Sequence, residues 1–125
     1  MLTLICGLPR AGKTTYSERF DDVIHLDTSG AYQGVICRLK HKSGDIIVEG
    51  VYRKVREREM LIQAYNGTGR KCIWLNTSDE VRRARRGWDK WCDKPFEAPT
   101  LSEGWDEIII IRGNDEQRIN RQTED

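Results

Sequence analysis

The chain has 125 residues and a formal net charge of +1, so it is predicted to form one domain without a global charge that would draw it to nucleic acid or a membrane. Its longest apolar runs are about five residues, which excludes a membrane-spanning helix from the prediction. Four cysteines without C-x-x-C spacing and only two histidines disfavour a disulfide framework and a structural zinc site. Reduced thiols and the lack of a signal peptide favour a cytoplasmic location.

A buried strand is predicted over residues 2–6, and a glycine-rich segment follows it directly. Gly7 to Thr14 reads G-x-x-x-x-G-K-T, the phosphate-binding P-loop signature. Its glycines let backbone N–H groups face phosphate oxygens, Lys13 supplies a charge for the β- and γ-phosphates, and Thr14 supplies a hydroxyl for Mg²⁺. We therefore expect ATP and Mg²⁺ as cofactors, with the nucleotide held by Gly7, Pro9, Arg10, Ala11, Gly12, Lys13, Thr14 and Thr15. The alternative is a plain glycine-rich turn beside a lysine.

Helices and strands are predicted to alternate along the rest of the chain. The expected helices span 14–20, 31–40, 53–65 and 81–86, and the expected strands 23–26, 46–48, 72–75 and 108–111. Residues 87–106 look irregular, and 113–125 form a polar, frayed tail. Together with the P-loop, this order predicts an α/β fold of the P-loop NTPase, nucleoside-kinase-like class: a three-layer sandwich around a mainly parallel five-stranded sheet. The kinase domain would span 1–112, with a short lid near 79–93.

Two carboxylates follow predicted strands at the sheet edge that carries the P-loop. Asp27 comes directly after the second strand, where phosphoryl transfer needs a base for the acceptor hydroxyl. Its alternative role is to cap a helix that starts in the turn at 28–30. Glu49 ends the third strand, where an acidic group can hold the water shell of Mg²⁺, or alternatively bond to local backbone. Candidates for phosphate, base and metal work thus share one sheet edge.

Four arginines crowd the short helix after the fourth strand: Arg82, Arg83, Arg85 and Arg86. Like charges at this spacing repel each other, so an anionic partner would compensate them. We expect a lid that places guanidinium groups over the transferring phosphoryl group, with a solvated basic face as the alternative. Ser78 and the two acidic residues after it are expected to cap this helix.

Other conspicuous side chains are given structural roles. The basic segment 53–58 is expected to be a solvated helix face, and His25 and Cys6 are expected to be core residues. Core or lid packing is also expected for Trp88, Trp91 and Trp105, with stacking on nucleic-acid bases as the alternative.

Residues 94–108 contain F-E-A-P-T-L-S-E-G-W, which resembles the F-E-x-P-T-x-x-E-G-F pattern in the kinase part of animal polynucleotide kinase-phosphatase. Residues 27–33 are similar to the D-T-x-G-x-W-Q segment of that family, and the resemblance implies that Asp27 is the catalytic base for a 5′-hydroxyl. Residues 47–50 resemble its I-D-N segment, with Glu49 in place of Asp. Residues 79–86 resemble its lid, where Arg82 and Arg86 fall on the lid arginines.

The resemblance implies an ATP-dependent polynucleotide 5′-hydroxyl kinase that transfers the γ-phosphoryl group to 5′-OH ends of DNA or RNA in nucleic-acid end healing. Lys13, Asp27, Arg82 and Arg86 would be catalytic, Thr14 and Glu49 would serve the metal, and no membrane partner is expected. No D-x-D-x-T phosphatase motif is present, so kinase activity alone is expected, as in a compact phage enzyme. A small-molecule P-loop kinase and a nucleotide-dependent binding module without phosphotransfer remain as alternatives. The choices between DNA and RNA and between ATP and GTP are also open.

Overall fold

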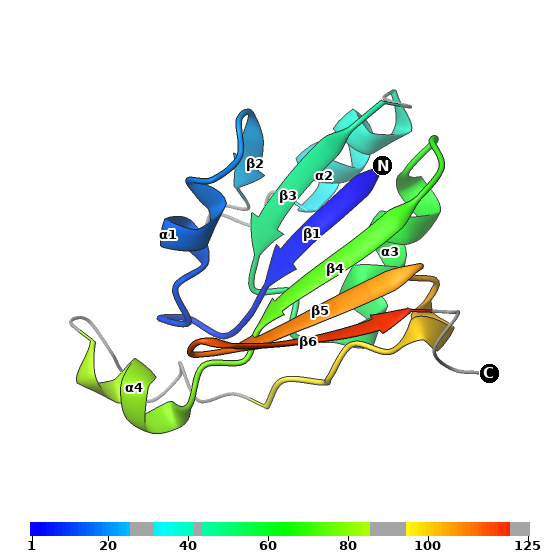
Figure 1. Cartoon of the computed structure of the whole chain (residues 1–125). Coiled ribbons are helices and arrows are strands. Elements are labelled where there is room, and N and C mark those ends of the chain that lie inside the picture. Colours follow the sequence, from blue (N-terminus) through cyan, green and yellow to red (C-terminus); the bar gives the residue numbers. More distant parts are fainter. Residues whose placement is uncertain (26–31, 42–43, 86–94, 121–125) are drawn as a thin grey trace.

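A computed structural model describes residues 1–25, 32–41, 44–85 and 95–120, apart from the side chains of residues 32 and 33. These residues form an α/β structure in which one sheet of six strands is flanked by helices (Figure 1). The strands are β1 (Leu2–Cys6), β2 (Val23–His25), β3 (Ile46–Gly50), β4 (Arg70–Leu75), β5 (Glu107–Arg112) and β6 (Asp115–Asn120). The helices are α1 (Lys13–Ser17), α2 (Tyr32–Lys40), α3 (Val55–Ala64) and α4 (Asp79–Ala84), and a short 3-10 helix spans Leu101–Glu103.

The strand order is β2-β3-β1-β4-β5-β6, and every pairing is parallel except that of β6 with β5. The arrowheads of β1, β3 and β4 therefore point to one edge of the sheet, the edge where α4 lies (Figure 1). The chain leaves β1 toward β2 on one side, but leaves β3 toward β4 on the other. Connections that leave neighbouring strands in opposite directions open a crevice at the carboxyl ends of those strands, which is where ligands bind in such sheets.

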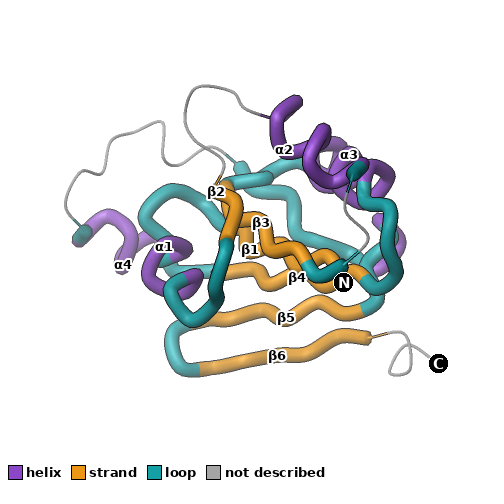
Figure 2. Tube along the Cα trace, turned by 90° about the horizontal axis from the view of Figure 1, so that it is seen from above, coloured by secondary structure: helices purple, strands orange, loops and turns teal. Residues whose placement is uncertain are grey.

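The alternation of side chains along the strands divides the core into two parts. One face of the sheet contributes Leu4, Val48 and Ile108 to a large cluster with residues of α2 and α3, such as Leu39 and Leu61. The opposite face contributes a smaller cluster, Ile5, Ile73 and Ile109, which packs against Ala11, Tyr16 and Phe20 at and after α1. Figure 2 shows α2 and α3 grouped together and α1 apart from them. The cleft described below lies beside the smaller cluster.

The frayed tail predicted from residue 113 is wrong over Asp115–Asn120, and the sheet has six strands instead of five. Residues 113 and 114 form a two-residue hairpin turn, and the register of the hairpin then pairs Ile119 with Ile108 and Arg118 with Ile109. Ile119 is the one strongly apolar residue of β6, so the sequence carries little strand pattern there. Backbone pairing with β5 determines this strand.

The predicted helices and strands from residue 2 to residue 112 are confirmed in type and order, with shifted ends. The helix predicted over 14–20 already ends at Ser17, and the strand predicted over 46–48 continues through Glu49 to Gly50. Asp27, Arg86, Trp88 and Trp91 lie outside the described residues. None of the helices in the described part of the chain has the length and apolar character needed to cross a lipid bilayer.

Candidate functional site

Residues 7–12, here called the glycine loop, connect the carboxyl end of β1 to the start of α1. A Cβ atom on Gly7 would lie 2.8 Å from the backbone oxygen of Leu75, so a larger residue does not fit beside the end of β4. Gly12 has a φ of 101° and Arg10 a φ of 69°, values that turn the backbone back on itself. The glycines therefore stand where the tight turn and the close approach to β4 require them.

Four successive carbonyl groups of the glycine loop each accept a hydrogen bond from a side chain. Lys13 Nζ donates to Leu8 at 3.0 Å, and Thr77 Oγ1 donates to Ala11 at 2.7 Å. Arg82 Nη1 donates to Pro9 at 3.2 Å, and Arg85 donates to the carbonyl of Arg10. In a planar trans peptide the N–H points away from the C=O, so these bonds direct the N–H groups of Arg10 and Gly12 away from the donors. The loop is held in one shape by side chains of α1, of the segment after β4 and of α4 with Arg85.

Lys13 is nearly enclosed, with 9% of its surface exposed. Burial lowers the pKa of its ammonium group below the ordinary 10.5, and the nearby charge of Glu49 opposes that change. The charged form is thus held in a position where water solvates it poorly. An anion beside this ammonium group would restore the preference for the charged form.

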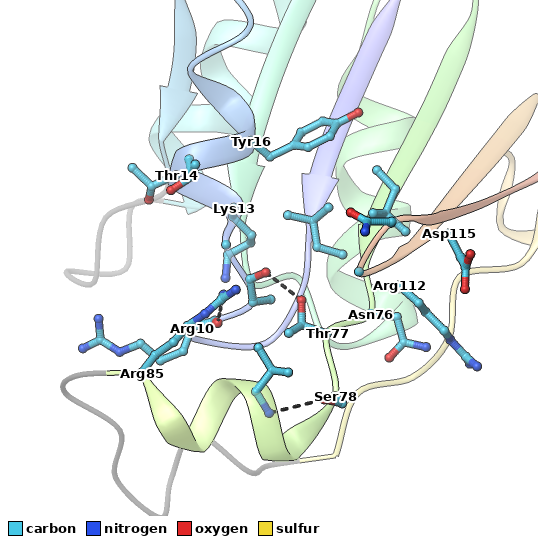
Figure 3. Close-up of a pocket in the computed structure, with 18 of the residues that line it drawn as sticks. Arg10, Lys13, Thr14, Tyr16, Asn76, Thr77, Ser78, Arg85, Arg112 and Asp115 are labelled. Carbon is cyan, nitrogen blue, oxygen red and sulfur yellow. Dashed lines mark hydrogen bonds between the residues drawn. The ribbon is translucent and has the colours of Figure 1, made fainter.

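A cleft of about 1220 Å³ opens beside the glycine loop, a volume above that of most small-molecule sites. Its walls are the first turns of α1, the segment after β4, the first residues of α4 with Arg85, and the β5–β6 hairpin. Figure 3 shows Lys13, Arg10 and Arg85 on one side of this space and Arg112 and Asp115 of the hairpin on the other. The cationic side chains that line it are Arg10, Lys13, Arg19, Arg85 and Arg112, against the carboxylates of Glu49, Asp115 and Glu116. This lining suits an anionic ligand.

Glu49 reaches the same cleft from the end of β3 and has an exposed fraction of 7%. Its Oε2 atom lies 2.8 Å from Nδ1 of His25, on the neighbouring strand β2. The prediction that His25 is a core residue is wrong, because β2 is an edge strand and 53% of the His25 side chain is exposed. The alternative expectation was that Glu49 bonds to local backbone. The structure instead pairs its carboxylate with the side chain of His25.

Thr14 and Glu49 are the side chains predicted to serve a metal, and both line the cleft. Within the described residues, no group of three or more His, Cys, Asp and Glu side chains is placed to hold a metal ion. One hydroxyl and one carboxylate fit Mg²⁺ rather than zinc, because Mg²⁺ keeps several waters and completes its shell with ligand phosphates.

Arg82 and Arg85 of the predicted lid have different environments. Arg82 is 1% exposed, and its guanidinium bridges the carbonyl of Pro9 and Oδ1 of Asp79, which is 2.7 Å away. Arg85 is exposed and extends over the glycine loop, where its Nη1 lies 3.3 Å from the position a Cβ of Gly12 would take. The predicted cap of α4 is confirmed, since Ser78 Oγ accepts from the backbone N–H of Val81.

Residues 95–108 belong to the F-E-x-P-T-like segment that resembles polynucleotide kinase-phosphatase, and their large apolar side chains pack in the core on the α3 side. Phe96 stacks on Trp74, and Trp105 is fully buried, as expected. Glu103 contacts Nε of Arg58 at 2.8 Å, so the prediction that residues 53–58 are a solvated face is wrong for Arg58, which is 0% exposed. Cys6 is buried as predicted, with its sulfur 3.6 Å from that of Cys72. These residues of the segment stabilise the fold.

The structure therefore brings Lys13, Thr14, Glu49 and Arg82 to one sheet edge. The sequence interpretation overlooked Thr77 and Arg112, although both follow predicted strands that end at this edge. Their position directly after these strands was the one sequence signal that could have identified them as site residues.

Comparison with protein-family models gives no match, and comparison with curated proteins gives none either.

Proposed function

We propose that the chain is an ATP-dependent kinase that transfers the γ-phosphoryl group to the 5′-hydroxyl end of a polynucleotide. The observation that carries the proposal is the glycine loop at the carboxyl end of β1, with the buried ammonium group of Lys13 at its base and a large cationic cleft beside it. Backbone N–H groups and a lysine arranged in this way favour the phosphates of a nucleotide.

The nucleotide side of the reaction depends on charge. The lowered pKa of Lys13 reflects burial, and triphosphate oxygens would stabilise its charged form. Thr14 and Glu49 would hold Mg²⁺, which when bound neutralises charge on the phosphate oxygens. The hydrogen bonds on the carbonyls of the loop keep its shape before the ligand arrives, which reduces the free energy of ordering it.

The acceptor side depends on Asp27, which follows β2 by two residues. Asp27 takes the proton of the acceptor hydroxyl as that oxygen bonds to the γ-phosphorus, and the bond from the γ-phosphorus to the bridging oxygen of ADP breaks. Strand β2 lies beyond β3 from the glycine loop, whereas the hairpin wall of the cleft lies on the other side of β1. An acceptor near Asp27 and a nucleotide in the cleft would thus approach from opposite sides, as in-line transfer requires.

The polynucleotide acceptor is inferred from the resemblance of residues 27–33, 47–50, 79–86 and 94–108 to the kinase family. Since Phe96, Leu101 and Trp105 pack in the core, the last of these segments supports kinship of fold more strongly than it supports the identity of the acceptor. A small alcohol as acceptor is therefore a competing outcome of the test.

The test is transfer of radiolabel from γ-labelled ATP to a panel of 5′-hydroxyl DNA and RNA oligonucleotides and small alcohols. We expect labelling of the oligonucleotides, none of the same oligonucleotides with a 5′-phosphate, and loss of labelling by a factor of about 10² or more in a folded Lys13→Ala variant. Lys40→Ala, at an exposed position of α2, is the matched control and should transfer normally. Labelling of small alcohols alone would overturn the assignment of a polynucleotide as the acceptor. ATP binding without any transfer would show that the protein is only a nucleotide-binding module.

A further inference from the structure

We propose that, of the two lid arginines that bond to the glycine loop in the described residues, Arg85 contacts the phosphates of the bound nucleotide, while Arg82 is a positioning residue that fixes α4 to the loop. The inference rests on the proposed nucleotide-binding function. It departs from the resemblance, which assigns the lid to Arg82 and Arg86.

Arg82 is engaged in holding two elements together. Its guanidinium donates to the carbonyl of Pro9 in the loop and to the carboxylate of Asp79 in the first turn of α4. Only 1% of its surface is exposed. Turning this side chain into the cleft would break both bonds and leave the partly buried carbonyl of Pro9 without this donor, which is unfavourable. Arg82 therefore acts on the nucleotide through the shape of the loop.

Arg85 has the opposite properties. It is exposed, it caps the end of α4, and it lines the cleft together with Lys13. Its guanidinium donates to the carbonyl of Arg10 and lies close to Gly12, at the part of the loop that would receive phosphates (Figure 3). A short movement of the guanidinium would exchange a neutral carbonyl for a charged phosphate oxygen.

That exchange is favourable, because phosphate oxygens carry negative charge and can accept two parallel N–H bonds from one guanidinium, whereas the carbonyl of Arg10 is neutral. It would also place the charge of Arg85 against the same phosphates as Lys13, where negative charge shifts during transfer. The bond between Arg85 and Arg10 then holds the side chain near its working position before the nucleotide binds. The two arginines predict different kinetic effects.

The test compares Arg85→Ala and Arg85→Lys with Arg82→Lys and Asp79→Ala, and uses Arg56→Ala on the exposed part of α3 as a control. For Arg85→Ala we expect a melting temperature close to that of the wild type and a single-turnover rate lowered by about 10²-fold or more at saturating ATP. Arg85→Lys should restore part of the rate, because a lysine supplies charge without the bidentate geometry. Arg56→Ala should behave as the wild type.

For Arg82→Lys we expect a lower melting temperature and a raised KM for ATP, with the rate at saturating ATP within about threefold of the wild type. Asp79→Ala removes only the exposed partner of Arg82, so it should fold and show the same change in KM to a smaller extent. A merely structural Arg82 would lower the melting temperature without this change in KM. A wild-type rate for Arg85→Ala, or an equal loss of rate for Arg82→Lys at saturating ATP, would overturn the inference while the kinase proposal stands.

If the wild type binds ATP but transfers nothing, the same variants are compared by ATP affinity. A loss of about tenfold or more in Arg85→Ala would then support the inference, and no loss would overturn it. Wild-type protein that binds neither ATP nor inorganic triphosphate would overturn both proposals.

Discussion

Among the described residues, Arg58 is buried beside Glu103 and Lys13 is buried near Glu49, and these two sites are built differently. In the core on the α3 side, Arg58 and Glu103 contact each other directly, with Nε–Oε1 and Nη2–Oε2 distances of 2.8 and 3.2 Å. At the cleft, Lys13 donates to the carbonyl of Leu8, and Glu49 pairs with His25. The core pair is joined directly and has further partners in the carbonyl of Tyr52 and the indole N–H of Trp105, whereas Lys13 and Glu49 at the cleft each bond to another group.

The pKa values follow this difference. Burial alone would lower the pKa of Arg58, but its hydrogen bonds and charge interaction with Glu103 raise it above its ordinary value. Burial lowers the pKa of Lys13, and the charge of Glu49 compensates only in part. A raised pKa indicates that the partners of a buried cation compensate for its burial, and a lowered pKa makes its surroundings a candidate site for an anionic ligand. The following experiments test that distinction.

The largest expected effect is on the core pair. Glu103→Gln keeps the shape of the side chain but leaves the charge of Arg58 uncompensated in the interior, which should lower the free energy of unfolding by about 3 kcal/mol. Urea unfolding measures it. Glu97→Gln, exposed and in the same segment, is the control and should change the value by no more than about 0.5 kcal/mol. A loss for Glu103→Gln as small as that of the control would show that the charge of Glu103 does not hold Arg58.

The same two regions show how far the sequence predicts this structure. The glycine loop, the order of strands and helices, and the Ser78 cap depend on neighbouring residues, so local patterns predict them. The burial of Arg58 depends on Glu103, which is 45 residues away in the sequence, and that of Arg82 depends on Pro9, 73 residues away. A run of charged residues on a helix looks the same whether or not such a distant partner exists. The burial of Arg58 and Arg82 therefore could not be predicted from local sequence patterns.

The next effect in size concerns Asp27, which the sequence predicts to be the base. Asp27→Asn should lower transfer to the hydroxyl by about 10²-fold or more while the melting temperature and ATP affinity stay near those of the wild type, because Asn caps a helix about as well as Asp. Asp27→Ala should be equally inactive and about 1 kcal/mol less stable through the lost cap. Asp21→Asn, exposed just before β2, is the control. If Asp27→Asn stays active, Asp27 is a cap and the base lies elsewhere.

The smallest expected effect is on the pH dependence of stability. It tests most directly whether burial of Lys13 is less well compensated than burial of Arg58. The pKa of Lys13 is lowered in the folded protein but stays near 10.5 in the unfolded chain. Below the lowered pKa both states carry the charge, and the full destabilisation by burial is present. Between that pKa and 10.5 the unfolded chain binds more protons than the folded protein, so the stability of the wild type rises with pH across this window.

Lys13→Met removes the buried charge and keeps most of the side-chain volume. It should therefore be more stable than the wild type at neutral pH, by a fraction of the Glu103→Gln effect, and this advantage should shrink as the pH rises toward 10.5. Urea unfolding of both proteins across that range measures the difference. Lys40→Met, at an exposed position, should show no such trend. An advantage that does not change with pH would mean that Lys13→Met acts through packing. The ammonium group would then be as well satisfied as the guanidinium of Arg58, and the contrast between the cleft and the core would fail.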